Sequence, residues 1–383
     1  MVSLSEVVAL DRKGVHPSEI APETPYIGLE HIERGGRILP HPQAGDSHLK
    51  SLKFSFSAEH ILYGKLRPNL GKISRPNFAG ICSTDILPLR PNAELDRNYL
   101  AHYLSQPAMI RYATSRATGV NLPRLSPTSL AKFPIPLPSL DEQRRIAAIL
   151  DQADAIRVKR QQQLESYNSL VESLFHSMFS QERADVTVGE IASDARSSIR
   201  TGPFGSQLRH SEFVGTGVAV LGLDNVVGNS FRWGERRYIT HEKYETLKRY
   251  TVHPGDVLIS IMGTVGRCAV VPQDIPLAIN TKHICAITPN QNIINPSFLR
   301  AAFLWHPVCR THLRRQTKGA IMAGLNMGII KSMPVPLPAL ERQNEFAKVS
   351  FAIKTQRYHL QRALDRDNEL FASLQSRAFR GEL

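Results

Sequence analysis

Few residues in the chain have the types and spacing that catalysis requires. The fourteen histidines include no His-Glu-x-x-His pattern, and there is no Gly-x-x-x-x-Gly-Lys-Ser/Thr loop. The stretch Gly202-Pro203-Phe204-Gly205 is too short to cradle a phosphate, so ATP binding is not predicted. Asp256 follows Gly255 with no second acidic residue nearby, and we interpret it as a turn residue. The sequence therefore predicts no enzyme, no metal site and no cofactor of its own.

A second candidate for chemistry is the run Asn295-Pro296-Ser297-Phe298. It is similar to the Asn-Pro-Pro-Phe motif with which adenine methyltransferases hold the amino group of a flipped base. Ser297 replaces the second proline, and no Phe-x-Gly-x-Gly loop is present to hold S-adenosylmethionine. We therefore interpret Asn295 as the start of a helix.

The positive charge of the chain is unevenly distributed. The net charge is +13, from 47 Lys and Arg against 34 Asp and Glu. The stretches 140–181 and 341–383 hold 13 basic and 12 acidic residues, which leaves 34 basic against 22 acidic residues elsewhere. A solvated basic surface would explain this excess. A polyanionic partner bound by the other two segments is the sharper interpretation.

The cysteines and the hydropathy pattern indicate the compartment. Cys82, Cys268, Cys285 and Cys309 form no Cys-x-x-Cys pair, which argues against a zinc site and is typical of a reducing cytoplasm. No apolar run approaches the length of a membrane span, and residues 1–6 lack the form of a signal peptide. We expect a cytoplasmic protein.

Two helices must organise the rest of the chain, because their sequences form a repeat. The run Pro134-Ile135-Pro136-Leu137-Pro138 with Gln143 recurs 200 residues later as Pro334-Val335-Pro336-Leu337-Pro338 with Gln343. Each run is followed by a long stretch without Pro or Gly, in which apolar residues recur every three or four positions. The spacing predicts two helices of about 38 residues, each on the order of 57 Å long. We expect them to pair as an antiparallel coiled coil.

The repeat also predicts details of each helix. Ser139 and Glu142 form a capping box at the first start, whereas Ala339 and Arg342 at the matching positions lose it. Polar residues interrupt both seams, which predicts imperfect packing: Arg157 and Arg160 in the first helix, Gln356 and Asp367 in the second.

Outside the helices the sequence predicts two α+β segments. Residues 2–7 resemble 186–191, and residues 26–32 resemble 220–226. We expect strands over 255–261 and 278–287 and helices around 96–113 and 296–316. The fold class is thus α+β, with two globular α/β domains joined by the two long helices in an internal pseudo-twofold repeat.

This arrangement resembles the specificity (S) subunit of type I restriction–modification systems. The resemblance rests on the two helical repeats, on Gly202–Ser206, on Pro254–Leu258 and on the run Arg377–Leu383. The first half departs from the Pro-Gly-Asp motif, with Ala58-Glu59-His60 in its place.

The resemblance implies a DNA-binding subunit without chemistry of its own. Its target recognition domains would be residues 1–139 and 182–338, each reading one half of a split, asymmetric DNA sequence. The helices 140–181 and 339–383 would set the spacer and bind two modification subunits, which restriction subunits then join. S-adenosylmethionine and ATP would be held by those partners.

Basic residues near loops are the candidates for contact with double-stranded DNA. In the first half they are Lys65, Arg67, Lys72, Arg75, Arg116 and Arg124, and the neutral Asn121 is a candidate beside them. In the second half they are Arg236, Arg237, Lys248, Arg249, Arg267, Lys282, Arg314, Arg315 and Lys318.

The end of the first helix is the candidate surface for the modification subunits. Its apolar residues cover more than the narrow seam that a two-helix pair would bury, so we expect an exposed interface. These residues are Leu170, Leu174, Phe175, Met178 and Phe179.

Two other functions fit parts of the sequence. One is a diverged methyltransferase or nuclease, which binding of S-adenosylmethionine by the isolated chain would reveal. The other is a two-helix adaptor with sugar- or protein-binding lobes, against which the distribution of charge argues.

Overall fold

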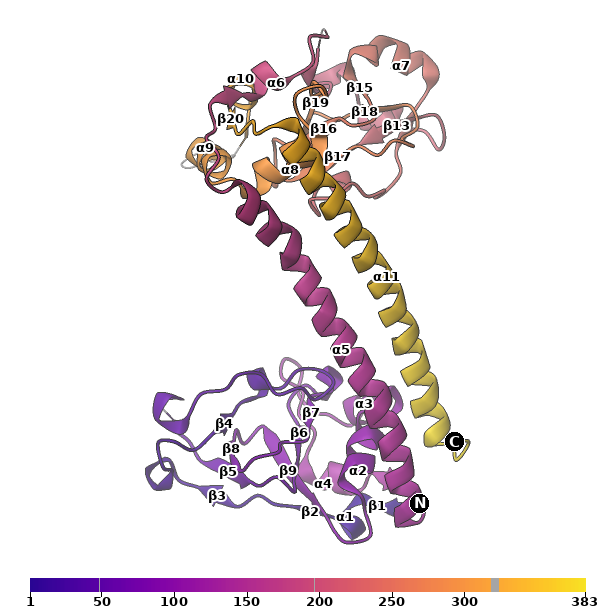
Figure 1. Cartoon of the computed structure of the whole chain (residues 1–383). Helices are drawn as coiled ribbons and strands as arrows, with labels where there is room; N and C mark the ends of the chain where they lie inside the picture. Colours follow the sequence, from indigo (N-terminus) through magenta and orange to yellow (C-terminus); the bar gives the residue numbers. More distant parts are fainter. Residues whose placement is uncertain (48, 196, 318–323) are drawn as a thin grey trace. The chain divides into compact units, whose positions relative to one another are not determined.

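The chain forms two compact units in a computed structural model that describes residues 1–47, 49–195, 197–317 and 324–383. Unit 1 comprises Met1–Gln162 and Gln361–Leu383, and unit 2 comprises Gln163–Leu360. Two long helices, α5 (Leu140–Phe179) and α11 (Leu340–Ala378), each contribute to both units. Two α/β domains linked by two long helices confirm the predicted fold class (Figure 1).

Unit 1 contains two four-stranded sheets. The first has the order β2-β9-β6-β7 and is antiparallel throughout; the second has the order β3-β5-β8-β4, in which β4 and β8 are parallel. The strands are β1 (Val2–Ser3), β2 (Val8–Leu10), β3 (Gly14–Val15), β4 (Tyr26–Ile27), β5 (Lys53–Phe56), β6 (Ile61–Gly64), β7 (Ile73–Ser74), β8 (Gly80–Cys82), β9 (Ile86–Pro91) and β10 (Pro134–Ile135). The short helices are α1 (Leu4–Val7), α2 (Arg97–Leu104), α3 (Pro107–Thr114) and α4 (Pro127–Ala131).

Unit 2 repeats this plan with one edge strand moved. Its sheets have the orders β12-β19-β16-β17 and β14-β13-β18-β15. The strands are β11 (Val186–Thr187), β12 (Ile199–Thr201), β13 (Val218–Leu221), β14 (Tyr238–Ile239), β15 (Thr251–Val252), β16 (Val257–Ser260), β17 (Cys268–Val270), β18 (Ala278–Asn280), β19 (Ile284–Ile287) and β20 (Pro334–Val335). The short helices are α6 (Val188–Ile191), α7 (His241–Leu247), α8 (Pro296–Trp305), α9 (Pro307–Thr317) and α10 (Met327–Lys331).

Two predicted elements are each divided in the structure. The strand expected over 278–287 is two strands in different sheets, because Thr281 turns the chain: its N–H donates to Leu221 O (2.9 Å) and its carbonyl accepts from Ile284 N. The helices expected around 96–113 and 296–316 are each broken before a proline, at Pro107 and Pro307. A proline is tolerated in the first turn of a helix, where its missing N–H costs nothing, and so it begins a new helix in each case.

The proline-rich runs position both long helices. In unit 1, β10 pairs antiparallel with β1, so that Ile135 lies opposite Val2. In unit 2, β20 pairs with β11 and places Val335 opposite Val186. Each run therefore joins the start of its half to the start of a long helix.

A buried glutamine near the start of each long helix bonds that helix to the segment just before α2 in unit 1 or α8 in unit 2. Gln143 Oε1 accepts from Asp96 N (2.8 Å), and its amide donates to Glu94 O and Pro138 O. Gln343 does the same with Asn295 N (2.9 Å), Ile293 O and Pro338 O. Both glutamines are fully buried. Their position in the repeat therefore has a structural cause.

Within each unit the long helices run antiparallel. In unit 1, Arg160 Nε donates to Asp367 Oδ2 (2.6 Å), and Arg157 Nε donates to Asn368 Oδ1 (2.9 Å) while its guanidinium lies 4.3 Å from the centre of the Phe371 ring. In unit 2, Arg342 donates to Met178 O (2.7 Å). Of the polar residues expected to weaken the seam, Arg160 and Asp367 thus bond to each other across it, and Arg157 bonds to Asn368.

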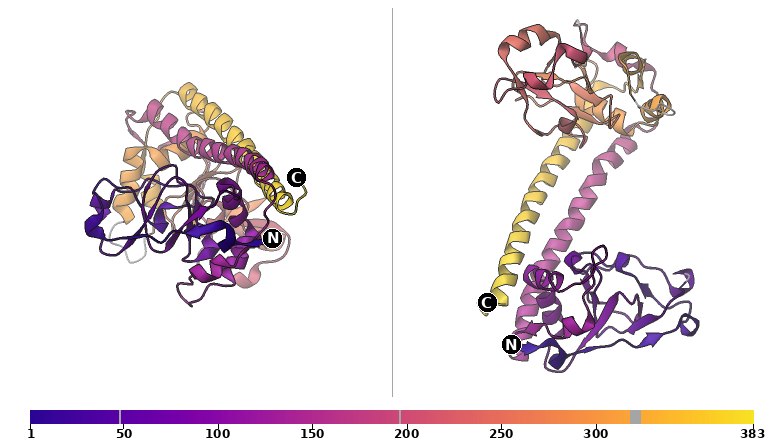
Figure 2. Two further views of the ribbon diagram at one scale, coloured as in Figure 1. Left: turned by 90° about the horizontal axis from the view of Figure 1, so that it is seen from below. Right: turned by 180° about the vertical axis from the view of Figure 1, so that it is seen from behind.

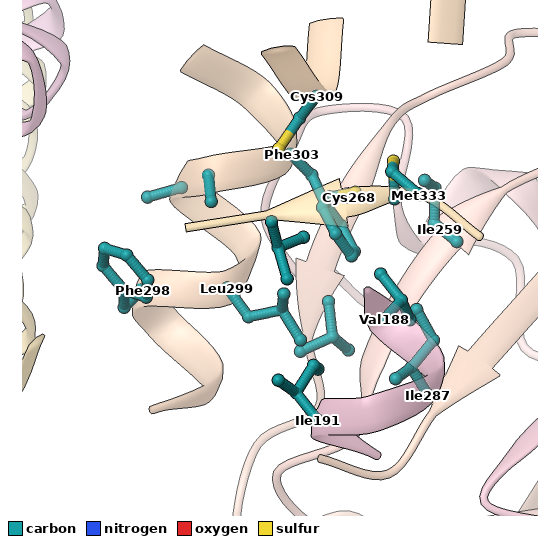
Figure 3. Close-up of a cluster of buried hydrophobic side chains, with 14 of the residues drawn as sticks. Val188, Ile191, Ile259, Cys268, Ile287, Phe298, Leu299, Phe303, Cys309 and Met333 are labelled. Atoms are coloured by element: carbon teal, nitrogen blue, oxygen red, sulfur yellow. The ribbon is translucent and has the colours of Figure 1, made fainter. Parts of the chain in front are cut away.

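The ends of the long helices lie in the hydrophobic cores. Phe175 and Phe179, near the end of α5, are fully buried in unit 2 against Phe346 and Phe298. Leu174 and Met178 pack against the same core. Figure 3 shows side chains of this core, among them Leu299 of α8 and Ile191 of α6. The end of α11 packs in the same way in unit 1, where the Phe379 ring lies 5.2 Å from that of Tyr99.

This arrangement corrects the predicted partner surface. Of its five residues, only Leu170 is largely exposed, at 45%. Phe175 and Phe179 are unavailable to another chain, because they are buried in the core of unit 2. The number of apolar residues along the helix indicated that other residues bury this face. It did not indicate that these residues belong to unit 2 of the same chain.

Candidate nucleic-acid interface

The first group of basic residues lies on the loop of the β6–β7 hairpin in unit 1. Arg67 adopts the left-handed conformation (φ 49°), and its N–H donates to Pro123 O (2.7 Å). Lys65 O accepts from Leu125 N, and Leu66 forms a β-bridge with Arg124. The hairpin loop 65–72 and the segment 115–125 are therefore one structural element, although about fifty residues separate them in the sequence.

This element presents several of the predicted residues together. Arg67 and Asn121 are exposed, and an Arg67 nitrogen lies 3.4 Å from Asn121 O. Arg124 is exposed and pairs with Asp85 (3.1 Å). Arg116 stacks over the Tyr112 ring at 3.4 Å. The loop is held rigidly by backbone bonds, while the guanidinium groups reach the surface.

Two predicted residues of unit 1 face inward instead. Lys72 Nζ donates to Leu29 O (2.6 Å), and Arg75 donates to Asp151 Oδ1 (2.6 Å), which also accepts from His102 Nε2. Burial would raise the pKa of Asp151, but the bonds from His102 and Arg75 outweigh it and hold that pKa below its usual value. Since Asp151 is ionised and neutralises Arg75, this arginine stabilises the start of α5, and we leave both residues out of the interface.

Unit 2 builds the same element at the β16–β17 hairpin. Leu325 N donates to Ile261 O (2.8 Å), and Met262 forms a β-bridge with Gly324. These bonds match those from Leu125 to Lys65 and between Leu66 and Arg124 in unit 1. Arg267 N donates to Ser260 Oγ (2.8 Å), which fixes the base of the loop and leaves the Arg267 side chain exposed.

Three arginines and a tryptophan line a cavity of about 490 Å³ beside this hairpin loop. Arg267 and Arg314 were predicted; Arg310 and Trp305 were not. Arg310 lies one helical turn before Arg314 on α9, where two like charges repel each other at that spacing. This i,i+4 pair of arginines is the signal in the sequence that could have revealed it.

The remaining candidates of unit 2 are dispersed. Arg315 lines a different hollow with His312 and Pro334, and Lys318 lies outside the described residues. Lys248 pairs with Glu245, and Arg249 stacks on Tyr250. Arg236 lies over the Trp233 ring at 5.1 Å, and Arg237 forms an ion pair with Asp224. Arg237 and Lys282 line one further cavity of the unit.

The residues singled out for catalysis have structural roles. Asn295 caps α8, accepting from Ser297 N (2.8 Å) and Phe298 N. Asp256 accepts the turn N–H of His253 (2.8 Å), as a turn residue would, and also forms a buried ion pair with Arg200. The cysteines are free and buried, and burial raises the pKa of the Cys82 thiol to about 12, which makes it a poor nucleophile.

In residues 1–47, 49–195, 197–317 and 324–383, no group of three or more His, Cys, Asp or Glu side chains is placed to hold a metal. Over the same residues, no helix has the length and apolarity to cross a membrane.

Known proteins match both repeats. The family model of the type I restriction modification DNA specificity domain matches residues 3–166 and 223–356. The type I restriction enzyme EcoDI specificity subunit of Escherichia coli is 28% identical over 41% of this chain and 36% of its own length. The EcoBI specificity subunit of the same organism is 25% identical over 73% of this chain and 65% of its own length. The chain therefore matches less than two thirds of the length of either relative.

A solved structure shows the same fold. The type I restriction-modification system S subunit from M. genitalium has a TM-score of 0.61 and 17% sequence identity, covering 99% of this chain and 95% of that one. Because the family model covers most of both halves, the chain belongs to the family of type I restriction-modification DNA specificity proteins.

Proposed function

We propose that the chain is the non-catalytic DNA-recognition subunit of a type I restriction–modification complex. Each unit would read one half of a bipartite, asymmetric DNA target. The observation that carries this proposal is the repeated element at the hairpin loops. In both units a hairpin loop with an exposed arginine, Arg67 or Arg267, is tied by the same backbone hydrogen bond to the segment that follows α3 or α9. Two copies of one element with different side chains are what a split, asymmetric target requires.

The chemistry of the element fits DNA. Exposed arginines can neutralise phosphates and position the duplex, while Arg67, Asn121 and Arg267 can reach base edges. Trp305 and the arginines beside it combine stacking with charge. None of these groups is arranged for bond breaking.

The partners are part of the same proposal. Two modification subunits, joined by restriction subunits, would supply S-adenosylmethionine and ATP chemistry, and the four free cysteines fit a cytoplasmic complex. We further propose that α5 and α11 set the spacer between the half-sites, because both helices run through both units. Leu170 remains exposed on α5 as a candidate contact for a modification subunit.

Selection of binding sites from a randomised DNA library tests the bipartite proposal. With the chain assembled with its modification subunits, we expect two specified blocks separated by an unspecified spacer of constant length. Recovery of a single block, or of two blocks at variable spacing, would contradict the roles of the two units and of the helices respectively.

The salt dependence of DNA binding tests the interface itself. Arg267→Ala with Arg314→Ala should lower the slope of log K against log salt by about two, because each phosphate contact contributes about 0.9. Arg67→Ala with Arg124→Ala should do the same through unit 1. Arg315→Ala is the matched control, since Arg315 is the next residue on α9 but lines a different hollow. An unchanged slope in both double variants would remove these residues from the interface.

A further inference from the structure

A second cavity of unit 2, of about 520 Å³, lies where three segments meet. These are the segment 203–213 after β12, the turn after β13 with Arg237 beside it, and the turn 281–283 between β18 and β19. Its volume lies in the range of about 300–1,000 Å³ that small ligands occupy. The hairpin element described above uses none of its residues.

The wall of this cavity contains polar groups that the protein does not satisfy. Asp224 and Arg237 form an ion pair, and their side chains are 33% and 31% exposed. Among the described residues, Asp224 Oδ2, Arg237 Nε and Thr281 Oγ1 are buried side-chain atoms without a hydrogen-bond partner. Such atoms are rare in native structures, because each costs about 1–3 kcal/mol. Three such atoms belong to residues that line this one cavity.

The charges of the wall define the ligand. Arg237, Lys282 and His283 line the cavity together with two carboxylates, those of Asp224 and Glu235. A phosphate would be attracted by the first set and repelled by the second. A neutral group with both donors and acceptors along one edge can use both sets.

The remaining wall is apolar. Leu208, Phe213 and Leu223 line the cavity and offer contact to a flat ring. Burial, then Lys282 and Arg237, lower the pKa of His283, so its imidazole is neutral at pH 7 and can donate at one nitrogen and accept at the other. A flat, uncharged ring with a hydrogen-bonding edge is a nucleobase.

Glycines allow the walls to approach. A Cβ on Gly202 would lie 2.1 Å from Asn280 O and 2.3 Å from the carbonyl carbon of Thr281, so no side chain fits there. A Cβ on Gly222 would lie 2.7 Å from Asp224 Oδ1. Gly202, the first residue of the Gly202-Pro203-Phe204-Gly205 run, thus lets the segment before the cavity lie directly against the 280–281 turn.

The matching place in unit 1 has different side chains. By strand register, Ile27 and Cys82 correspond to Leu221 and Asn280. The residues that follow are Gly28-Leu29-Glu30 and Ser83-Thr84-Asp85, where unit 2 has Gly222-Leu223-Asp224 and Thr281-Lys282-His283. An acid therefore replaces the histidine, and the position would accept a different group.

We infer that this cavity binds one nucleobase of the half-site read by unit 2 and specifies its identity. The inference rests on the proposed function and adds to it a second contact region, a cavity that holds one base.

The test repeats the binding-site selection with cavity variants of the full chain in its complex. The variants are Asp224→Asn, Thr281→Val and Lys282→Met; Lys331→Met is the control, because it removes one exposed positive charge of unit 2 outside both cavities. We expect each cavity variant to reduce or change the base preference at one position of one half-site. The expected change is on the order of 10-fold, as is typical for loss of a specific base contact. The other half-site should stay as in the wild type.

Each other outcome overturns the inference in its own way. Equal weakening of all sequences would show that the cavity contacts phosphate. An unchanged preference in Lys282→Met, an exposed position where folding is not at risk, would show that no base is read there. If the wild type selects no bipartite site at all, the proposed function fails, whereas a bipartite wild-type site with unchanged variants removes only the cavity.

Discussion

At one corner of its antiparallel sheet, each unit pairs an acidic residue with a basic one. The positions of the acidic and the basic residue are exchanged between the two units. In unit 1, Leu10 and Ile61 pair with Leu89; in unit 2, Ile199 and Val257 pair with Ile287. The neighbouring residues are therefore equivalent: Asp11 corresponds to Arg200, and His60 corresponds to Asp256. Asp11 and His60 lie 3.0 Å apart, and Arg200 and Asp256 form an ion pair. The acid has moved from one strand to the other.

What both corners keep is a hydrogen-bond acceptor at the turn. His60 Nδ1 accepts from Ser57 N (3.0 Å), and Asp256 Oδ2 accepts from His253 N (2.8 Å). A histidine can thus replace the aspartate of a Pro-Gly-Asp turn, provided that the facing residue becomes an acid. The backbone geometry is fixed, and the chemistry that satisfies it can change.

The two corners differ in burial. Asp256 and Arg200 have side chains 0% and 7% exposed, and Arg200 also donates to Thr251 O (2.7 Å) and Thr288 Oγ1 (2.9 Å). Asp11 is 31% exposed and shares its carboxylate with Arg90. Unit 2 therefore depends on its pair far more than unit 1 does.

Breaking both corners should show this difference as the largest effect. Asp256→Asn leaves the Arg200 guanidinium buried without a counter-charge, which should cost unit 2 about 3–5 kcal/mol. Asp11→Asn removes a partly exposed pair and should cost unit 1 less than about 1 kcal/mol. Hydrogen exchange of the full chain, followed separately in β16–β19 and in β6–β9, measures each loss. Equal losses in the two units would refute the comparison.

The two helix ends offer a second matched pair, 200 residues apart. Phe179 of α5 is fully buried, with its ring 4.9 Å from that of Phe298 in unit 2. Figure 2 shows α11 in yellow, running to the C-terminus of the chain. Phe379, just after α11, is only half-buried between Tyr99 and Tyr103 of unit 1. Phe179→Ala should destabilise unit 2 by about 3–4 kcal/mol and Phe379→Ala should destabilise unit 1 by about 2 kcal/mol. The measurement is hydrogen exchange in α8 and in α2.

These two variants also test which unit the end of each long helix stabilises. Phe179 belongs to the helix of the first half, yet its substitution should loosen unit 2. Leu170→Ala is the control, because Leu170 lies two to three turns earlier on α5 and is exposed. A loss of protection in unit 1 after Phe179→Ala would contradict the packing of α5 into unit 2.

Periodicity and capping rules were enough to predict the framework. The starts of both long helices and the cap at Asn295 follow from short-range patterns, and the repeat follows from comparing segments 200 residues apart. The structure shows helices beginning at Leu140 and Leu340. Pro107 and Pro307 could also have predicted the break of each expected helix, since proline favours the first turn of a new helix.

Long-range partners were not predictable from a single sequence. Arg200 and Asp256 are 56 residues apart, and nothing in either local sequence identifies the other. The same limit explains the wrong prediction for Phe175 and Phe179, because an apolar face does not say which chain covers it. At the interface, the loops 65–72 and 115–125 were each marked by charge, but only the bonds between them show that Arg67 and Arg124 share one surface.

The smallest expected effect should be equal in the two units. Gln143 and Gln343 make the same three hydrogen bonds: one from the backbone N–H of a helix-capping residue, one to a carbonyl two residues earlier, and one to the carbonyl of Pro138 or Pro338. Leucine at either position keeps the volume but leaves these backbone groups without partners. Each unsatisfied buried group costs about 1–3 kcal/mol, but burying leucine in place of the amide offsets part of that cost, so we expect a net loss of about 2 kcal/mol in each unit. Gln163→Leu, at an exposed position of α5, should change neither. Hydrogen exchange at the N-termini of α2 and α8 would report the two losses. A clear difference between the two losses would mean that the two glutamines, although they make the same hydrogen bonds, contribute unequally to stability. The pairs Asp11–His60 and Arg200–Asp256 are expected to show such an inequality, because they occupy equivalent positions but differ in burial.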